Sequence, residues 1–182
     1  MPLIDGDLWL RPRGSDDHIE LSWTGDREIE RFGREWKAST WRSTWDRRRR
    51  QAFWLVLSGE TIGEVELIDI RRGDRTAELR IGIARPELLG HGYGSRAIRL
   101  VLTHAASHLH LSSVYLRVRE MNHRAVGCYL NCGFRKRGRL QGGRFRDPIL
   151  LMDCRLPSGQ EGVLDGLQGV SVEETAAGES LA

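Results

Sequence analysis

The stretch Leu88-Leu89-Gly90-His91-Gly92-Tyr93-Gly94-Ser95-Arg96-Ala97 decides the fold of this chain. Its three glycines stand at alternate positions, and an apolar pattern typical of a helix follows immediately. A glycine-rich loop that leads into a helix presents unpaired backbone N–H groups together with the positive end of the helix dipole. The stretch therefore predicts an anion site suited to a phosphate or pyrophosphate, and a flexible turn is the alternative interpretation.

Two familiar phosphate-binding patterns do not fit this loop. The P-loop has Lys and then Ser or Thr after its last glycine, whereas Ser95 and Arg96 follow Gly94 here. The dinucleotide fingerprint has the spacing G-x-G-x-x-G near the first strand and an acid about 20 residues further on. Here the spacing is G-x-G-x-G in mid-chain, with no acid placed downstream. The loop is therefore expected to hold the pyrophosphate of a different carrier.

Two motifs carry a resemblance to a known protein family, and they occur here in the same order as in that family. The segment 77–97, AELRIGIARPELLGHGYGSRA, resembles the acetyl-CoA-binding core of the GCN5-related N-acetyltransferases (GNAT superfamily). About 30 residues later, segment 122–134 is similar to the family form N-x-x-A followed by Y-x-x-x-G-F. The resemblance covers roughly residues 6–155 and is strongest to the branch that holds spermidine acetyltransferases and ribosomal-protein N-terminal acetyltransferases.

The resemblance implies a fold, a donor and a set of binding residues. The fold would be α/β, with a mixed, mostly antiparallel central sheet flanked by helices, and acetyl-CoA would be the acetyl donor. The residues that match the family's cofactor-binding positions are Ile81, Gly82, Ile83, Leu89, Gly90, His91, Gly92, Tyr93, Gly94, Ser95 and Asn122. The chain departs from the family at Leu89, where the superfamily usually has Arg or Gln. His91 or Arg96 is the alternative source of positive charge.

The resemblance also suggests catalytic residues. Tyr129 matches the family tyrosine that reaches the coenzyme sulfur, and a phenol with a pKa of about 10 can protonate a departing thiolate; packing of its ring is the alternative. Glu78 matches an acid common in this branch and is the first candidate for the general base, with Glu66 and Asp69 as rivals. A solvated acid at a strand end is the alternative for Glu78. Asn122 is also suited to cap the helix that it begins.

Composition indicates a soluble protein with one main domain. The chain has 182 residues, 40% of them hydrophobic and 29% charged, and no apolar run approaches the ~20 residues that span a bilayer. The N-terminus lacks the pattern of a signal peptide. Three cysteines without a C-x-x-C motif favour a reducing cytoplasm. Cys128 and Cys132, one helical turn apart, are expected to pack, and no metal site is expected.

The charge distribution divides the chain into two parts. Residues 1–156 form the expected acetyltransferase domain, whose 28 basic and 20 acidic residues give a net charge of +8. Residues 157–182 contain five acids and no Lys or Arg, and they are rich in Gly, Ser and Glu, which is typical of a disordered tail. The alternative is that this tail folds back onto the basic body.

Periodicity predicts the order βααβββαβαββ. A helix is expected to begin at Ser15 or Asp16 and run toward Trp23, and a phase break is expected near Ile68 in the strand 61–70. A second helix is expected over 38–51 and further helices over 93–108 and 122–131. The expected strands are 8–12, 53–57, 61–70, 77–84, 114–118, 134–140 and 149–155.

Three functions remain open at this point. The first is an N-acetyltransferase that acts on a primary amine, whose acceptor is a protein N-terminus, a polyamine or an antibiotic-like small molecule. The second is an RNA- or ribosome-binding module that uses the run Arg47–Arg50 with nearby tryptophans, although a solvated helix face is the commoner meaning of such a run. The third is an acyl-CoA sensor without activity. Dimers are frequent in the family, so a homodimer is the assembly that the resemblance suggests.

Overall fold

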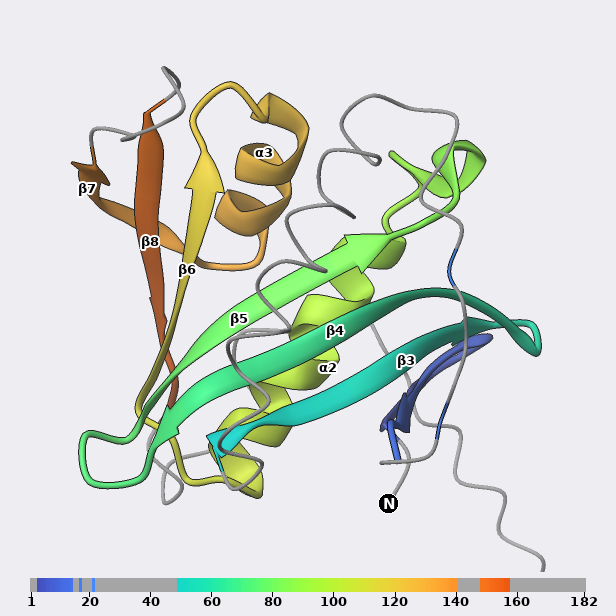
Figure 1. Cartoon of the computed structure of the whole chain (residues 1–182), viewed down its shortest axis with the longest axis horizontal. Helices are drawn as coiled ribbons and strands as arrows, with labels where there is room; N and C mark the ends of the chain where they lie inside the picture. The colour runs from blue at the N-terminus through green and yellow to red at the C-terminus, as the bar shows by residue number, and fades with distance from the viewer. Residues whose placement is uncertain (1–2, 15–16, 18–20, 22–48, 141–147, 158–182) are drawn as a thin grey trace, which may run out of the picture.

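A computed structural model describes residues 3–14, 17, 21, 49–140 and 148–157. These residues form one eight-stranded sheet in the order β1-β2-β3-β4-β5-β6-β8-β7, with helices packed against it (Figure 1). Only β5 and β6 run parallel; the other neighbours are antiparallel. The elements are β1 Leu3–Asp5, β2 Leu8–Pro12, β3 Gln51–Leu57, β4 Glu60–Arg71, β5 Thr76–Ile83, the 3₁₀ helix η2 Pro86–Leu88, α2 Tyr93–Ser107, β6 Ser113–Arg119, α3 His123–Asn131, β7 Arg135–Leu140 and β8 Ile149–Arg155. The predicted mixed, mostly antiparallel sheet with flanking helices is confirmed.

The elements predicted from residue 53 onward are confirmed within two residues at each end. The phase break expected near Ile68 is also confirmed, because the β4–β5 register shifts between Ile68 and Arg71, where Asp69 has a φ of 48°. A shift of this kind adds a residue to one strand and turns the following side chains to the other face. Strand β1, which pairs with β2, was not predicted.

The prediction of a helix over 38–51 was wrong at its end, because Gln51 is the first residue of β3. Gln51 pairs with Leu67 of β4 and is therefore part of the sheet. Three predicted parts of the chain lie outside the described residues: 38–48 of this helix, most of the helix expected near Trp23, and residues 158–182.

Helix α2 packs on one face of the sheet and forms the core with it. Its buried residues are Ala97, Ile98, Val101, Leu102 and Ala105, at the spacing of one helix face. They join a cluster of inward-facing strand residues, among them Leu10, Leu55, Val65, Leu67 and Leu79. Because side chains alternate along a strand, Glu64, Glu66 and Glu78 lie on the opposite face of the sheet.

The parallel pair β5 and β6 creates the feature that positions the site. The two strands pair only from Thr76 to Glu78 on β5 and from Ser113 to Tyr115 on β6. Beyond these residues they diverge, as Figure 1 shows, and α2 connects them. The second half of β5, which includes Ile81 to Ile83, therefore has no strand partner on its β6 side within the described part of the chain. This gap opens next to the glycine loop that precedes α2.

Candidate acetyl-donor and acceptor site

The glycine loop ends in a helix that has no side-chain cap. Gly90 and Gly92 have φ values of 81° and 86°, a left-handed conformation that favours glycine. Gly92 is the N-cap of α2, and no side chain of the described residues caps the first turn. Arg96 N donates to Gly92 O at 3.0 Å as the first helical hydrogen bond. The preceding N–H groups, those of Tyr93 to Ser95, therefore have no partner within the helix, which is the feature that the predicted anion site needs.

A cavity of about 500 Å³ connects the loop, the gap between β5 and β6, and helix α3. Its wall includes glycines and apolar side chains, with three arginines. The lining residues are Ile81, Gly82, Ile83, Leu88, Leu89, Gly90, Gly92, Tyr93, Gly94, Ser95, Ile98, Arg117, Val118, Arg119, Met121, Asn122, Arg124, Ala125, Cys128, Tyr129 and Asn131. Of the eleven cofactor-binding residues predicted, ten line this one cavity.

Helix α3 supplies the wall that faces the loop. Asn122 Oδ1 accepts a hydrogen bond from Ala125 N at 3.0 Å, so the expected N-cap is present. The Tyr129 ring packs edge-on against Phe134, with centroids 5.8 Å apart, and its hydroxyl has no hydrogen-bond partner among the described residues. Burial, with Cys128 and Cys132 nearby, raises the pKa of Tyr129 above the ordinary value for a phenol. Tyr129 therefore stays protonated at neutral pH.

Two cysteines of α3 have different surroundings. Cys132 is buried and packs in the core, as predicted, whereas Cys128 lines the cavity with its Sγ 3.2 Å from Ser95 Oγ. Hydrogen bonds with Cys132 and Ser95 lower the pKa of Cys128, and the same contact with Cys128 together with burial raises the pKa of Cys132. Among the described residues, no three His, Cys, Asp or Glu side chains gather as metal ligands.

The two side chains expected to replace the missing family cation at Leu89 lie outside the cavity wall. His91 Nδ1 is 3.0 Å from Leu89 O, and the His91 ring stacks on Tyr93. Arg96 instead binds the hairpin between β1 and β2: its Nε donates to Asp5 at 2.8 Å and its Nη2 to Asp7 at 2.8 Å. Arg96 therefore ties the first turn of α2 to the N-terminal strands.

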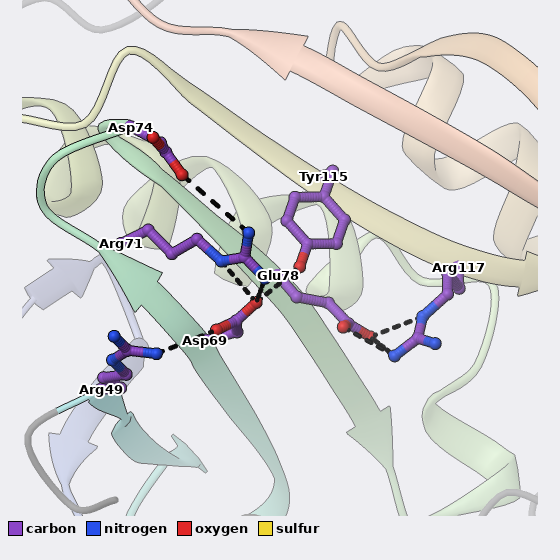
Figure 2. A network of polar contacts seen from close by, with 7 residues as sticks. All are labelled: Arg49, Asp69, Arg71, Asp74, Glu78, Tyr115 and Arg117. Atoms are coloured by element: carbon purple, nitrogen blue, oxygen red, sulfur yellow. Dashed lines mark hydrogen bonds and ion pairs between the residues drawn. The ribbon is translucent and has the colours of Figure 1, made fainter.

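Glu78, the first candidate for the base, is buried and does not line the cavity. It accepts hydrogen bonds from Arg117 Nε at 3.2 Å and from Arg117 Nη2 at 3.0 and 2.8 Å (Figure 2). Arg80 Nε donates a further bond at 3.4 Å. The carboxylate is therefore occupied by two guanidinium groups and lies away from the cavity wall, where an amine acceptor would have to approach it. The assignment of Glu78 as base stays a prediction.

The rival acids are also bound by arginines. Glu66 is 1% exposed and pairs with Arg50, whose own pKa burial lowers. Asp69 accepts hydrogen bonds from Arg71 Nε at 3.0 Å and from the Tyr115 hydroxyl at 3.3 Å (Figure 2). Neither acid lines the cavity.

The arginine run considered for RNA binding is therefore partly internal. Arg50 is mostly buried against Glu66, and Arg49 pairs with Asp69 at 3.9 Å. Arg47 and Arg48 lie outside the described residues. A buried guanidinium that is bound to a carboxylate cannot contact a phosphate backbone.

Sequence reasoning missed the three arginines of the cavity, Arg117, Arg119 and Arg124. Arg117 and Arg119 alternate with the buried Leu116 and Val118, so the strand pattern places them on one face of β6 but does not reveal what they face. Arg124 lies in the first turn of α3 and was not predicted either.

Within the described part of the chain, no helix has the length and apolar character needed to cross a membrane.

Comparisons with known proteins agree with this geometry. The model of the acetyltransferase (GNAT) domain family matches residues 7–135. Spermidine N(1)-acetyltransferase of Escherichia coli is 34% identical over 102 residues, which are 53% of this chain and 54% of that protein. The Vibrio cholerae enzyme of the same name is 40% identical over 91 residues, 47% of this chain and 52% of the relative. The match thus spans about half the length of these curated relatives.

Solved structures extend the likeness to most of the chain. A spermidine N-acetyltransferase chimera from Vibrio cholerae and hSSAT has a TM-score of 0.63 at 28% identity. The match covers 82% of this chain and 96% of the chimera. The Vibrio cholerae enzyme in complex with CoA and spermine has a TM-score of 0.62 at 24% identity, over 83% and 96%, and shares the fold. With the family model covering residues 7–135, the chain belongs to the GNAT acetyltransferase domain family.

Proposed function

We propose that this chain is an N-acetyltransferase that transfers the acetyl group of acetyl-CoA to a primary amine, by direct attack of the amine while both substrates are bound. The observation that carries the proposal is the single cavity that joins the uncapped start of α2, the unpaired half of β5 and Tyr129. The family and the names of the spermidine-acetylating relatives support the same reaction class.

The residues present fit acetyl-CoA as donor. The N–H groups of Gly90 to Ser95 would hold its pyrophosphate, because the left-handed glycines leave the backbone exposed and the helix dipole favours negative charge. The backbone of Ile81 to Ile83 would hold the pantetheine arm in the way an added strand is held, since β6 has diverged at this point. Asn122 combines its cap with a place in the cavity wall.

The chain's own groups supply the rest of the chemistry. When bound, the donor supplies an activated acetyl group as a thioester. A backbone N–H near Ile81 to Ile83 would polarise the thioester carbonyl, a contact of the oxyanion type worth about 3 kcal/mol. Tyr129, which burial keeps protonated, would give its proton to the departing thiolate. No described acid reaches the cavity wall, so the amine would lose its proton to water there.

Two measurements test the proposal. Calorimetry should show that the folded chain binds acetyl-CoA and CoA, and transfer of radiolabelled acetyl groups should be seen with an amine panel of polyamines, peptides, amino acids and aminoglycosides. A well-folded chain that takes up no CoA would overturn the binding site. Binding without transfer to any amine would instead favour the acyl-CoA sensor.

Restoring the family cation at Leu89 should strengthen donor binding. Leu89 lines the cavity next to Gly90, and L89R would add a charge-assisted hydrogen bond to a phosphate, which we expect to lower the Kd for CoA about tenfold. The effect should weaken as salt rises. The control is E87Q, which makes the same change in net charge on η2 at an exposed side chain outside the cavity. Equal gains from both variants would show that only overall charge matters.

A further inference from the structure

All three buried acids of the described residues lie on the sheet face opposite α2, and each is bound to an arginine. Glu64 is paired with Arg13 at 2.8 Å, Glu66 with Arg50, and Glu78 with Arg117 at 2.8 Å. Burial raises the pKa of Glu64, while the neighbouring Arg13 and Arg50 oppose that shift. These carboxylates are already neutralised by the protein, so none of them is available to a cationic ligand without breaking a buried ion pair.

The described wall of the cavity offers no carboxylate that could pair with a polyamine. Among the described residues that line it are three arginines, Arg117, Arg119 and Arg124, and no Asp or Glu. Spermidine and spermine are polycations, and their recognition needs carboxylates that are free to pair with ammonium groups.

Arg117 is the cation best placed to meet an acceptor. Its Nε and Nη2 bind Glu78, and this fixes the guanidinium where β5 and β6 begin to part. The third nitrogen, Nη1, has no hydrogen-bond partner among the described residues. The side chain is 48% exposed and lines the cavity. A guanidinium held rigid on one side therefore presents its other side to the cavity, which suits a carboxylate.

We propose that the acceptor is an amine that also carries a carboxylate, and that Arg117 binds this carboxylate while Glu78 holds Arg117 in position. The inference rests on the proposed acetyltransferase function and narrows its acceptor. A cation beside the amine has a second effect, because it disfavours the ammonium form and so favours the neutral amine that attacks. Glu78 thus acts as a positioning residue in this arrangement.

The test compares matched amines that differ only in charge. Each amino acid or short peptide is assayed beside its C-terminal amide, with spermidine and spermine as polycations. For the wild type, kcat/KM should be higher for the carboxylate than for its amide, and lowest for the polyamines. In the double variant E78Q/R117Q, which removes the cation without leaving a buried carboxylate unpaired, the carboxylate-to-amide ratio should fall at least about tenfold.

The carboxylate-to-amide ratio separates the proposed role of Arg117 and Glu78 from other roles of these two residues. E78Q keeps the guanidinium but releases it from its carboxylate partner, so it should lower the carboxylate-to-amide ratio, though less than E78Q/R117Q does. Any loss of a general base would affect both amines equally and cancel in this ratio. R117K should keep part of the preference as a point charge. R137Q/D153N removes an ion pair of 2.6 Å on β7 and β8, outside the cavity, and is the matched control.

The outcomes distinguish the two proposals. A wild-type chain that binds no acetyl-CoA would refute the acetyltransferase function. A chain that binds it but prefers spermidine to every carboxylate-bearing amine would overturn the acceptor inference alone. So would a carboxylate preference that survives in E78Q/R117Q, or a double variant whose main defect is weaker acetyl-CoA binding, because Arg117 would then serve the donor.

Discussion

Replacing Tyr129 with phenylalanine is expected to lower kcat for acetyl transfer roughly 10²- to 10⁴-fold, the range typical of a lost general acid. The ring would still pack against Phe134, so the fold and the wall of the cavity should persist. Because only the hydroxyl group is removed, the Kd for acetyl-CoA should stay nearly unchanged. Steady-state kinetics with calorimetry of donor binding measures both quantities.

The raised pKa of Tyr129 gives this prediction a pH signature. A phenol whose pKa lies above about 10 keeps its proton as the pH rises through the neutral range. Loss of the tyrosine proton should therefore not limit kcat below pH 10 in the wild type. An alkaline limb of the kcat profile below that pH would have to come from another group, and it should persist in Y129F.

Tyr115 provides the matched control for Tyr129. It is also partly buried, but its hydroxyl donates to Asp69 at 3.3 Å and it does not line the cavity. Y115F removes the same atom from the neighbouring strand β6 and should lower kcat far less than Y129F. If the two variants lose equal activity, or if Y129F keeps full activity, the hydroxyl of Tyr129 is not the proton donor.

Local patterns in the sequence predicted the conformation of the glycine loop, the start of α2 and the cap of α3. The glycine spacing at Gly90 and Gly92 requires left-handed backbone followed by a helix, and the structure has both. Asn122 is followed by an apolar helical pattern and is the cap. These features depend on residues close together in the chain, for which backbone sterics and capping give specific signals.

The contact between Glu78 and Arg117 was not predicted, because it joins residues that are distant in the chain. Glu78 and Arg117 are 39 positions apart and meet only because β5 and β6 are adjacent in the sheet. Arg96 similarly reaches back 91 positions to Asp5, on a strand too short for a periodic signal. A sequence shows that a carboxylate is present but not which cation neutralises it, so Glu78 resembled a free base.

Gly63 is the position where a single methyl group should damage the fold most. It lies on β4 opposite Ile83, and a Cβ atom there would be 2.2 Å from Gly82 O and 3.0 Å from Ile83 Cα. Both obstructing atoms belong to the backbone, which cannot rotate away as a side chain can, so β4 and β5 would have to separate. We expect G63A to lower the free energy of unfolding by about 3 kcal/mol or more.

The G63A substitution should also alter the shape of the cavity, because Gly82 and Ile83 line it. Displacing this part of β5 should weaken CoA binding as well as stability, which urea unfolding and calorimetry measure separately. Gly73 is the matched control: it lies in the turn between β4 and β5, and an added Cβ there would have nothing within 4 Å. G73A should change stability by less than about 0.5 kcal/mol. If G63A were equally harmless, the close approach of β4 and β5 at Gly63 would be wrong, and with it the placement of Gly82 in the wall.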